Sequence, residues 1–240
     1  MDFKKVKRYV VLGILFFLPV TFLLFLYPAT HNYTPLDIVN DSVLDLEAFK
    51  SDNGEKILLK DHITILGFLG ENPIDNVIAA SNLKELVYDK FKGFKKFQMV
   101  IVVPEGTQEA VEKLIKEINS YEDIRFWHFV YGEPDAIQKV YNSLKSNSNL
   151  NSSLATNSVF IVDKDLSQRG RIDDRTDNEI VKNKTIYSLN SYDCIEVAEI
   201  KNKMSEDMRI LFTEYRQKRK GDFDSTTRRA NDLKEHHEEN

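Results

Sequence analysis

The sequence predicts an α/β protein in which a central sheet is flanked by helices, preceded by one transmembrane helix near the N-terminus. Three observations lead to this prediction. A long uncharged apolar run follows a basic N-terminus, short β-rich apolar runs recur through the middle of the chain, and segments with helical spacing lie between those runs. Strands that alternate with helices are typical of layered α/β folds. A length of 240 residues suits one domain with appendages, or two small domains.

Composition excludes several classes of protein. With 42% hydrophobic and 30% charged residues, the chain can form an ordered core, and it is neither disordered throughout nor a polytopic membrane protein. A net charge of −5 disfavours nucleic acid as a partner. The single cysteine, Cys194, excludes an intramolecular disulfide and a cysteine-rich metal site.

The N-terminal run predicts a single-pass anchor in the cytoplasmic membrane at residues 9–30. Its apolar part, from Tyr9 to Tyr27, would form a helix of roughly 28 Å, close to the thickness of a bilayer core. Residues 1–8 are basic, so we expect this segment to stay in the cytoplasm and the rest of the chain to be extracytoplasmic (periplasmic). A cleaved signal peptide is the alternative. The residues that follow the apolar run, however, lack the pair of small side chains that a cleavage site requires. The basic residues are Lys4, Lys5, Lys7 and Arg8, opposed by Asp2.

The first elements after this run are short. Residues 31–42 read as a linker, and residues 43–216 as the folded domain. Apolar and polar residues alternate at 43–49, which predicts a half-buried strand. The Asp52-Asn53-Gly54 turn then leads to a returning strand at 56–59.

The middle of the domain shows alternating strand and helix patterns. Apolar runs predict strands at 63–69, 97–103, 124–130 and 158–163, with a hairpin partner at 170–175. Helices are predicted after Asn72-Pro73, after Thr107 and after Pro134, and again at 192–216. The Ser- and Asn-rich segment 143–158 reads as a solvated loop, and 217–240 as a charged, disordered tail.

The order of these elements and some of their residues resemble the SCO/SenC family. The similar segments run from about Val43 to Lys218. They are Asp52-Asn53-Gly54, Gly67-Phe68-Leu69, Trp127-His128-Phe129 with Gly132, Ser158 to Asp163, and Arg169 to Asp174. The resemblance implies a membrane-anchored, thioredoxin-like domain linked to copper delivery and cytochrome oxidase assembly.

The residues that carry chemistry in that family are missing at the similar positions. The family motif Cys-Pro-x-x-Cys corresponds to Asn72-Pro73-Ile74-Asp75-Asn76, and the family histidine to Ala155-Thr156-Asn157. Thiol–disulfide exchange requires a thiolate, and Cu(I) prefers sulfur ligands. The sequence therefore predicts a degenerate site at Asn72, Pro73 and Asn76, with no catalytic residue, no metal ligand and no cofactor.

Other candidate sites remain as alternatives. Asn72 either caps a helix with its side chain or helps to bind an anion at the helix N-terminus. Carboxylates at Asp75, Asp163, Asp173 and Asp174 could form a weak site for a hard cation, although surface turns are often acidic. His31, His62 and His128 are far apart in sequence, and His236-His237 lie in the tail. Cys194 is either buried and inert or a reactive thiol, and the charged tail is either solvated or a docking peptide.

The predicted function follows from these residues and from the resemblance. We expect a redox-inactive, non-enzymatic accessory protein of membrane-complex assembly, cytochrome oxidase being the complex that the resemblance implies. Its expected partners are the membrane and an integral membrane complex. The alternative is a metal- or small-ligand-binding protein that uses the acidic hairpin and the Asn72–Asn76 loop.

Overall fold

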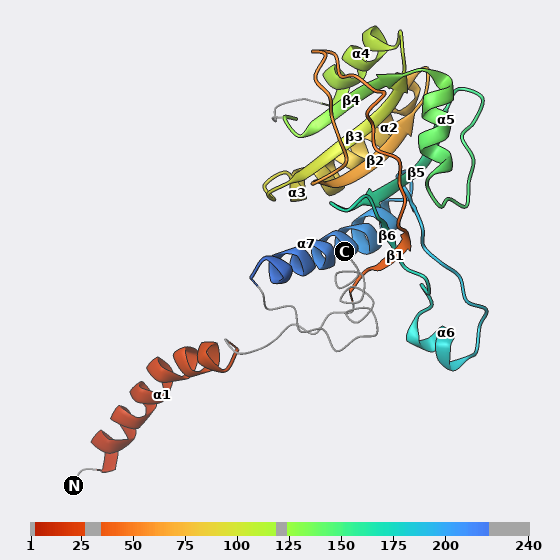
Figure 1. The fold of residues 1–240 in the computed structure, drawn as a ribbon. Coiled ribbons are helices and arrows are strands. Elements are labelled where there is room, and N and C mark those ends of the chain that lie inside the picture. The colour runs from red at the N-terminus through yellow and green to blue at the C-terminus, as the bar shows by residue number, and fades with distance from the viewer. Residues whose placement is uncertain (1–2, 27–34, 119–123, 221–240) are drawn as a thin grey trace. The chain divides into compact units, whose positions relative to one another are not determined.

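The computed structural model describes residues 3–26, 35–118 and 124–220, which belong to two compact units, residues 1–34 and 35–240 (Figure 1). The first unit contains α1 (Phe3–Leu26). Its apolar side chains from Val10 to Leu24 are largely exposed, and Pro19 lies within the helix.

The prediction of a membrane-spanning helix is not supported by α1. Among the described residues, no helix combines the length and the hydropathy that crossing a bilayer requires. Four basic residues occupy the first turns of α1, so its uncharged part begins only at Tyr9. Residues 27–30, the end of the predicted span, lie outside the described residues.

The second unit is built on one mixed sheet. Within the described residues it has seven strands, and the order is β1-β6-β5-β2-β3-β4, with β7 paired to β5. Strands β2, β3 and β4 are parallel, whereas β5 is antiparallel to β2 and to β6. The strands are β1 (Asp37–Asn40), β2 (Ile63–Leu69), β3 (Phe97–Pro104), β4 (Trp127–Gly132), β5 (Ala155–Val162), β6 (Gln168–Gly170) and β7 (Tyr192–Asp193).

Helices flank this sheet, which confirms the predicted α/β layer architecture (Figure 1). They are η1 (Pro73–Asn76), α2 (Val77–Leu83), η2 (Lys84–Tyr88), α3 (Asp89–Phe91), α4 (Gln108–Ile118), α5 (Pro134–Asn142), α6 (Asp177–Val181), η3 (Glu199–Met204) and α7 (Ser205–Lys220). Of these, η1 is a 3₁₀ helix, and η2 and η3 are π-helical.

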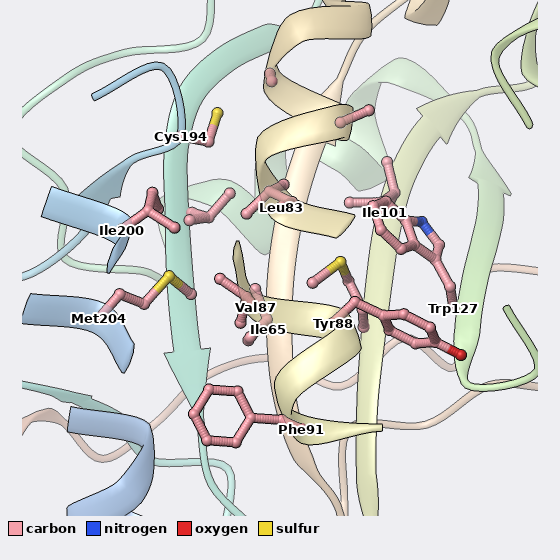
Figure 2. Packing of buried hydrophobic residues seen from close by; sticks show 14 of the residues in the cluster. Ile65, Leu83, Val87, Tyr88, Phe91, Ile101, Trp127, Cys194, Ile200 and Met204 are labelled. Carbon is pink, nitrogen blue, oxygen red and sulfur yellow. The ribbon is translucent and has the colours of Figure 1, made fainter. Parts of the chain in front are cut away.

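The two faces of the sheet carry separate apolar clusters because side chains alternate along each strand. On β3, Met99 and Ile101 belong to one cluster, and Val100 and Val102 to the other. Figure 2 shows the first cluster, which side chains of α2, η2 and η3 complete. The second cluster is covered by α5 and by buried side chains from the segment 43–59.

The predicted strands at 43–49 and 56–59 are wrong. Both segments are irregular, although Leu46 and Leu59 are fully buried. The carboxylate of Asp45 accepts the backbone N–H groups of Leu46 at 2.8 Å and of Leu59 at 2.7 Å. A side chain thus satisfies backbone groups that a strand ladder would otherwise pair.

Several boundaries also differ from the predictions. β1 lies inside the segment predicted as a linker, of which residues 31–34 are outside the described residues. The hairpin partner is 168–170 rather than 170–175, and residues 192–193 form β7 before the last helical segment begins at 199. α7 continues past residue 216 to Lys220, and the rest of the predicted tail, 221–240, is outside the described residues.

Candidate functional site

The degenerate site predicted at Asn72–Asn76 follows the end of β2. Strand pairing places Phe68 opposite Thr156 and Leu69 opposite Ala155. The backbone N–H of Glu71 then donates to the carbonyl of Ser153 at 2.9 Å. The structure therefore brings the 72–76 loop next to the segment that leads into 155–157, the second segment singled out by the resemblance.

The two asparagines of this loop have different surroundings. Asn76 is half-buried, and its Nδ2 donates to the carbonyl of Leu69 at 2.9 Å. Asn72 is exposed and occupies the predicted N-cap position, with Pro73 after it, but its side chain makes no capping bond. Its backbone carbonyl instead accepts the N–H of Asp75 at 3.0 Å, which closes the 3₁₀ turn, and Pro73 is buried at the start of that turn.

The donor set at this loop does not suit copper. Neutral amide oxygens are hard ligands, and Asn76 already uses its amide nitrogen to bond Leu69. Within residues 3–26, 35–118 and 124–220, no group of three or more His, Cys, Asp or Glu side chains is placed to hold a metal ion.

Three of the four acidic residues of the predicted weak ligand site form ion pairs with basic residues of the chain itself. Asp163 is buried and accepts from Arg169 Nη1 at 2.8 Å. Asp173 pairs with Arg175 at 2.7 Å, and Asp174 pairs with Arg171 at 3.1 Å and with Lys203. Asp75 lies exposed on η1. The structure therefore does not assemble Asp75, Asp163, Asp173 and Asp174 into a cation site, and the alternative function that depends on it gains no support.

A network of ion pairs that was not predicted from the sequence joins α7 to β6 and to Arg171, which follows β6. Arg169 is 1% exposed and donates to Glu214 at 2.6 Å as well as to Asp163. Two residues further along, Arg171 binds Asp207 at 2.7 Å, and Tyr192 donates to the same carboxylate at 2.6 Å. Burial opposes charge on Arg171, but its hydrogen bond to Asp207 and the negative charge there raise its pKa above the ordinary value. This network fixes α7 against the sheet.

A sequence signal for this network does exist. Asp207 and Glu214 are seven residues apart, which places them on one face of a helix. That face also carries Leu211, which is fully buried. Two carboxylates on a buried helix face require cationic partners, and Arg169 and Arg171 lie at the two-residue spacing that places side chains on one side of a strand.

Cys194 is buried beside β5, which contains Asn157. Its N–H donates to the carbonyl of Asn157 at 2.9 Å, and its carbonyl accepts from Asn82 Nδ2 at 3.0 Å. Its side chain lies in the first apolar cluster, as Figure 2 shows. Burial, followed by the charge of Asp193, raises the pKa of the thiol to about 12. The interpretation of Cys194 as a buried residue is confirmed.

We predict that Cys194 reacts very slowly with a thiol reagent at pH 8. A pKa near 12 in place of 9.0 lowers the thiolate fraction by about a thousandfold, before restricted access is counted. The reaction of the folded protein with a chromogenic disulfide should accelerate at least that much in denaturant. Rapid reaction of the folded protein would show that the thiol is accessible.

Among the described residues, the histidines belong to no group of three or more side chains that could hold a metal ion. His128 is half-buried on β4, where burial and then the charge of His62 lower its pKa. These two residues are distant in sequence, and the structure brings them close enough to interact, which the sequence analysis did not foresee. His62 Nδ1 lies 3.0 Å from the carbonyl of Lys60. His31, His236 and His237 lie outside the described residues.

Comparison with known proteins gives structural matches only. No family model matches the sequence, and no curated protein matches it. BsSco, described as a member of the Sco family of cytochrome c oxidase assembly proteins, matches with 14% identity and a TM-score of 0.44, over 75% of this chain and 98% of that one. ScoI of Arabidopsis thaliana, solved with copper bound, matches with 15% identity and a TM-score of 0.40, over 70% and 99% of the two chains.

A thioredoxin domain of a thiol-disulfide oxidoreductase from Bacteroides vulgatus also matches. Its identity is 19% and its TM-score 0.36, over 62% of this chain and 100% of that one. Sco proteins are thus among the structural matches, at low identity. The fold itself is a mixed sheet with flanking helices.

Proposed function

We propose that this chain is a thioredoxin-fold binding protein that performs neither thiol nor copper chemistry. The proposal rests on the residues of the loop that follows β2. Asn72 and Asn76 stand where the similar family has cysteines, and the amide of Asn76 bonds the carbonyl of Leu69. The only cysteine, Cys194, is buried elsewhere in the core. The loop therefore serves as a fixed surface feature, and the protein acts by recognising a partner rather than as an enzyme.

The partner that we propose is an integral membrane complex during its assembly, with cytochrome oxidase as the specific case. Support comes from the ordered resemblance to SCO/SenC, which includes Asp52-Asn53-Gly54, Trp127 and the segment Arg169–Asp174. In the structure, Arg169 and Arg171 of that segment form ion pairs with α7.

A deletion strain tests the proposed role. Loss of the protein should lower the amount of assembled oxidase in membranes, and the wild-type chain should restore it. A Cys194→Ser variant should restore it equally, because the thiol takes no part. Unchanged oxidase and an unchanged membrane proteome in the deletion strain would contradict the assembly role. A folded Cys194→Ser variant that fails to restore the oxidase would contradict the absence of thiol chemistry.

We also propose that α1 attaches the protein to a membrane, with residues 35–220 on the extracytoplasmic side. The exposed apolar side chains of α1, among them Leu15, Phe16 and Leu23, support attachment. The basic residues at its start support the orientation. The full chain should sediment with membranes and lose this property when residues 3–26 are deleted, and protease added outside spheroplasts should digest the folded domain. A full chain found in the soluble fraction would contradict attachment.

A further inference from the structure

A cavity of about 750 Å³ opens at the end of the sheet where β2 begins. Ile63, the first residue of β2, lines it together with residues that follow α3 and with the last turns of α7. These elements lie close together because Phe91 and Phe94 both stack on Phe212. A volume of this size suits a small organic molecule.

The cavity is distinct from the Asn72–Asn76 loop, which follows the other end of β2. A strand of seven residues separates the two places by roughly 20 Å. Ligand binding in the cavity therefore does not require the Asn72–Asn76 loop, and the inference is independent of the proposed function.

Aromatic rings form part of the cavity wall. The rings of Phe94 and Phe212 stack with their centroids 4.3 Å apart and an interplanar angle of 28°. Tyr215 also lines the cavity, and its hydroxyl donates to Asp165 at 3.3 Å. Phe94 is 37% exposed, so part of this residue is open to a molecule that enters.

The other lining side chains are mainly cationic, and none of the described lining residues is acidic. They are Lys95, Lys164, Arg216, Lys218 and Arg219. Lys218 pairs with Glu214 at 3.1 Å. Within the part of the chain that the structure describes, no acidic side chain forms an ion pair with Lys95, Arg216 or Arg219.

The pKa of Lys164 reflects its burial and this excess of positive charge. Its ammonium lies 4.9 Å from the centroid of the Tyr215 ring, and Lys218 approaches the same ring at 5.0 Å. Burial lowers the pKa of Lys164, and repulsion from Lys96 and Arg219 lowers it further, against the opposing charges of Asp165 and Asp61. A bound anion would relieve this repulsion.

We propose that this cavity binds a phosphorylated small molecule that carries a flat ring. Arg216 and Arg219 provide guanidinium groups, which bind phosphate through paired hydrogen bonds. Lys95 and Lys164 add positive charge, and the ring of Phe94 offers a stacking surface for the flat part of the ligand.

Calorimetry on the full chain tests this assignment with three probes: inorganic phosphate, glycerol phosphate and ATP. Glycerol phosphate represents a lipid headgroup, and ATP combines phosphate with a flat ring. We expect ATP to bind at least about tenfold more tightly than either of the other probes. Equal or tighter binding of glycerol phosphate would overturn the assignment, because the flat ring would then contribute nothing.

Three variants locate the binding. Arg216→Glu/Arg219→Glu should weaken ATP binding by at least about tenfold, while the matched charge reversal Lys113→Glu/Lys116→Glu on α4 should leave it unchanged. Phe94→Leu should weaken the binding of ATP but not that of inorganic phosphate. Equal effects of the two charge reversals would overturn the proposal.

The acidic C-terminal residues Glu235, Glu238 and Glu239 are the competing occupant, because they follow α7 in the chain. Deletion of residues 221–240 should leave the affinity for ATP within about twofold of that of the full chain. A gain of tenfold or more would overturn the assignment in favour of this segment as the resident anion.

Discussion

Replacing Arg169 with methionine should destabilise the folded protein by about 3–5 kcal/mol, the range found when one partner of a buried ion pair is removed. The guanidinium of Arg169 bonds Asp163 at 2.8 Å, Glu214 at 2.6 Å and the carbonyl of Leu36 at 2.9 Å. Methionine fills a similar volume but leaves both carboxylates buried without a cation from β6. Urea denaturation followed by the fluorescence of the single tryptophan, Trp127, which is 4% exposed, measures the loss.

Arg175→Met is the matched control for this variant. Arg175 pairs with Asp173 at 2.7 Å, and the two side chains are 15% and 34% exposed, so water screens these charges more than those around Arg169. We expect little change in its unfolding free energy. Adding Asp163→Asn and Glu214→Gln to Arg169→Met should recover part of the loss, because neutral side chains replace the unpaired charges. Equal stabilities of Arg169→Met and Arg175→Met would show that the buried network does not hold α7.

Gly70→Ala should destabilise the protein by about 2–5 kcal/mol, from backbone strain together with overpacking. Gly70 has φ +72°, a conformation that L-residues rarely adopt. A Cβ here would overlap the carbonyl oxygen of Ser153 and lie 2.8 Å from the Cβ of Ala155. The strand that precedes the Asn72–Asn76 loop would have to separate from the 151–155 segment.

Gly54→Ala separates the two contributions to this loss. Gly54 has a similar φ of +76°, but nothing lies within 4 Å of the position of its Cβ. Its substitution should therefore cost only the backbone strain, about 1–2 kcal/mol. If Gly70→Ala and Gly54→Ala cost the same, the close approach of the Ser153 carbonyl contributes nothing to the order of the loop.

The parts of the fold that sequence analysis predicted are those with a strong local pattern. β2 and β3 are continuous apolar runs because both of their faces are buried, and their predicted positions hold to within one residue. The helices α4 and α5 have regular apolar spacing and were also predicted. Such patterns depend only on neighbouring residues.

The parts that were missed depend on contacts between residues far apart in the chain. The bond from the Leu59 N–H to Asp45 crosses 14 residues and makes an alternating segment irregular. The pair Arg169–Glu214 crosses 45 residues. At the candidate site, the resemblance predicts that Asn72 and Asn76 stand at the cysteine positions of the similar family. No sequence pattern indicates that Asn76 bonds the carbonyl of Leu69.

The affinity of the full chain for Cu(I), measured by competition with a chromogenic chelator, tests the central claim most directly. We predict no binding tighter than micromolar, with the same result for Cys194→Ser. The variant Asn72→Cys/Asn76→Cys restores two soft ligands to the loop and should bind Cu(I) at least about tenfold more tightly. Tight binding by the unaltered chain, whether or not it survives Cys194→Ser, would contradict the account, because the residues of the loop would then belong to a working metal site or the buried thiol would be a ligand.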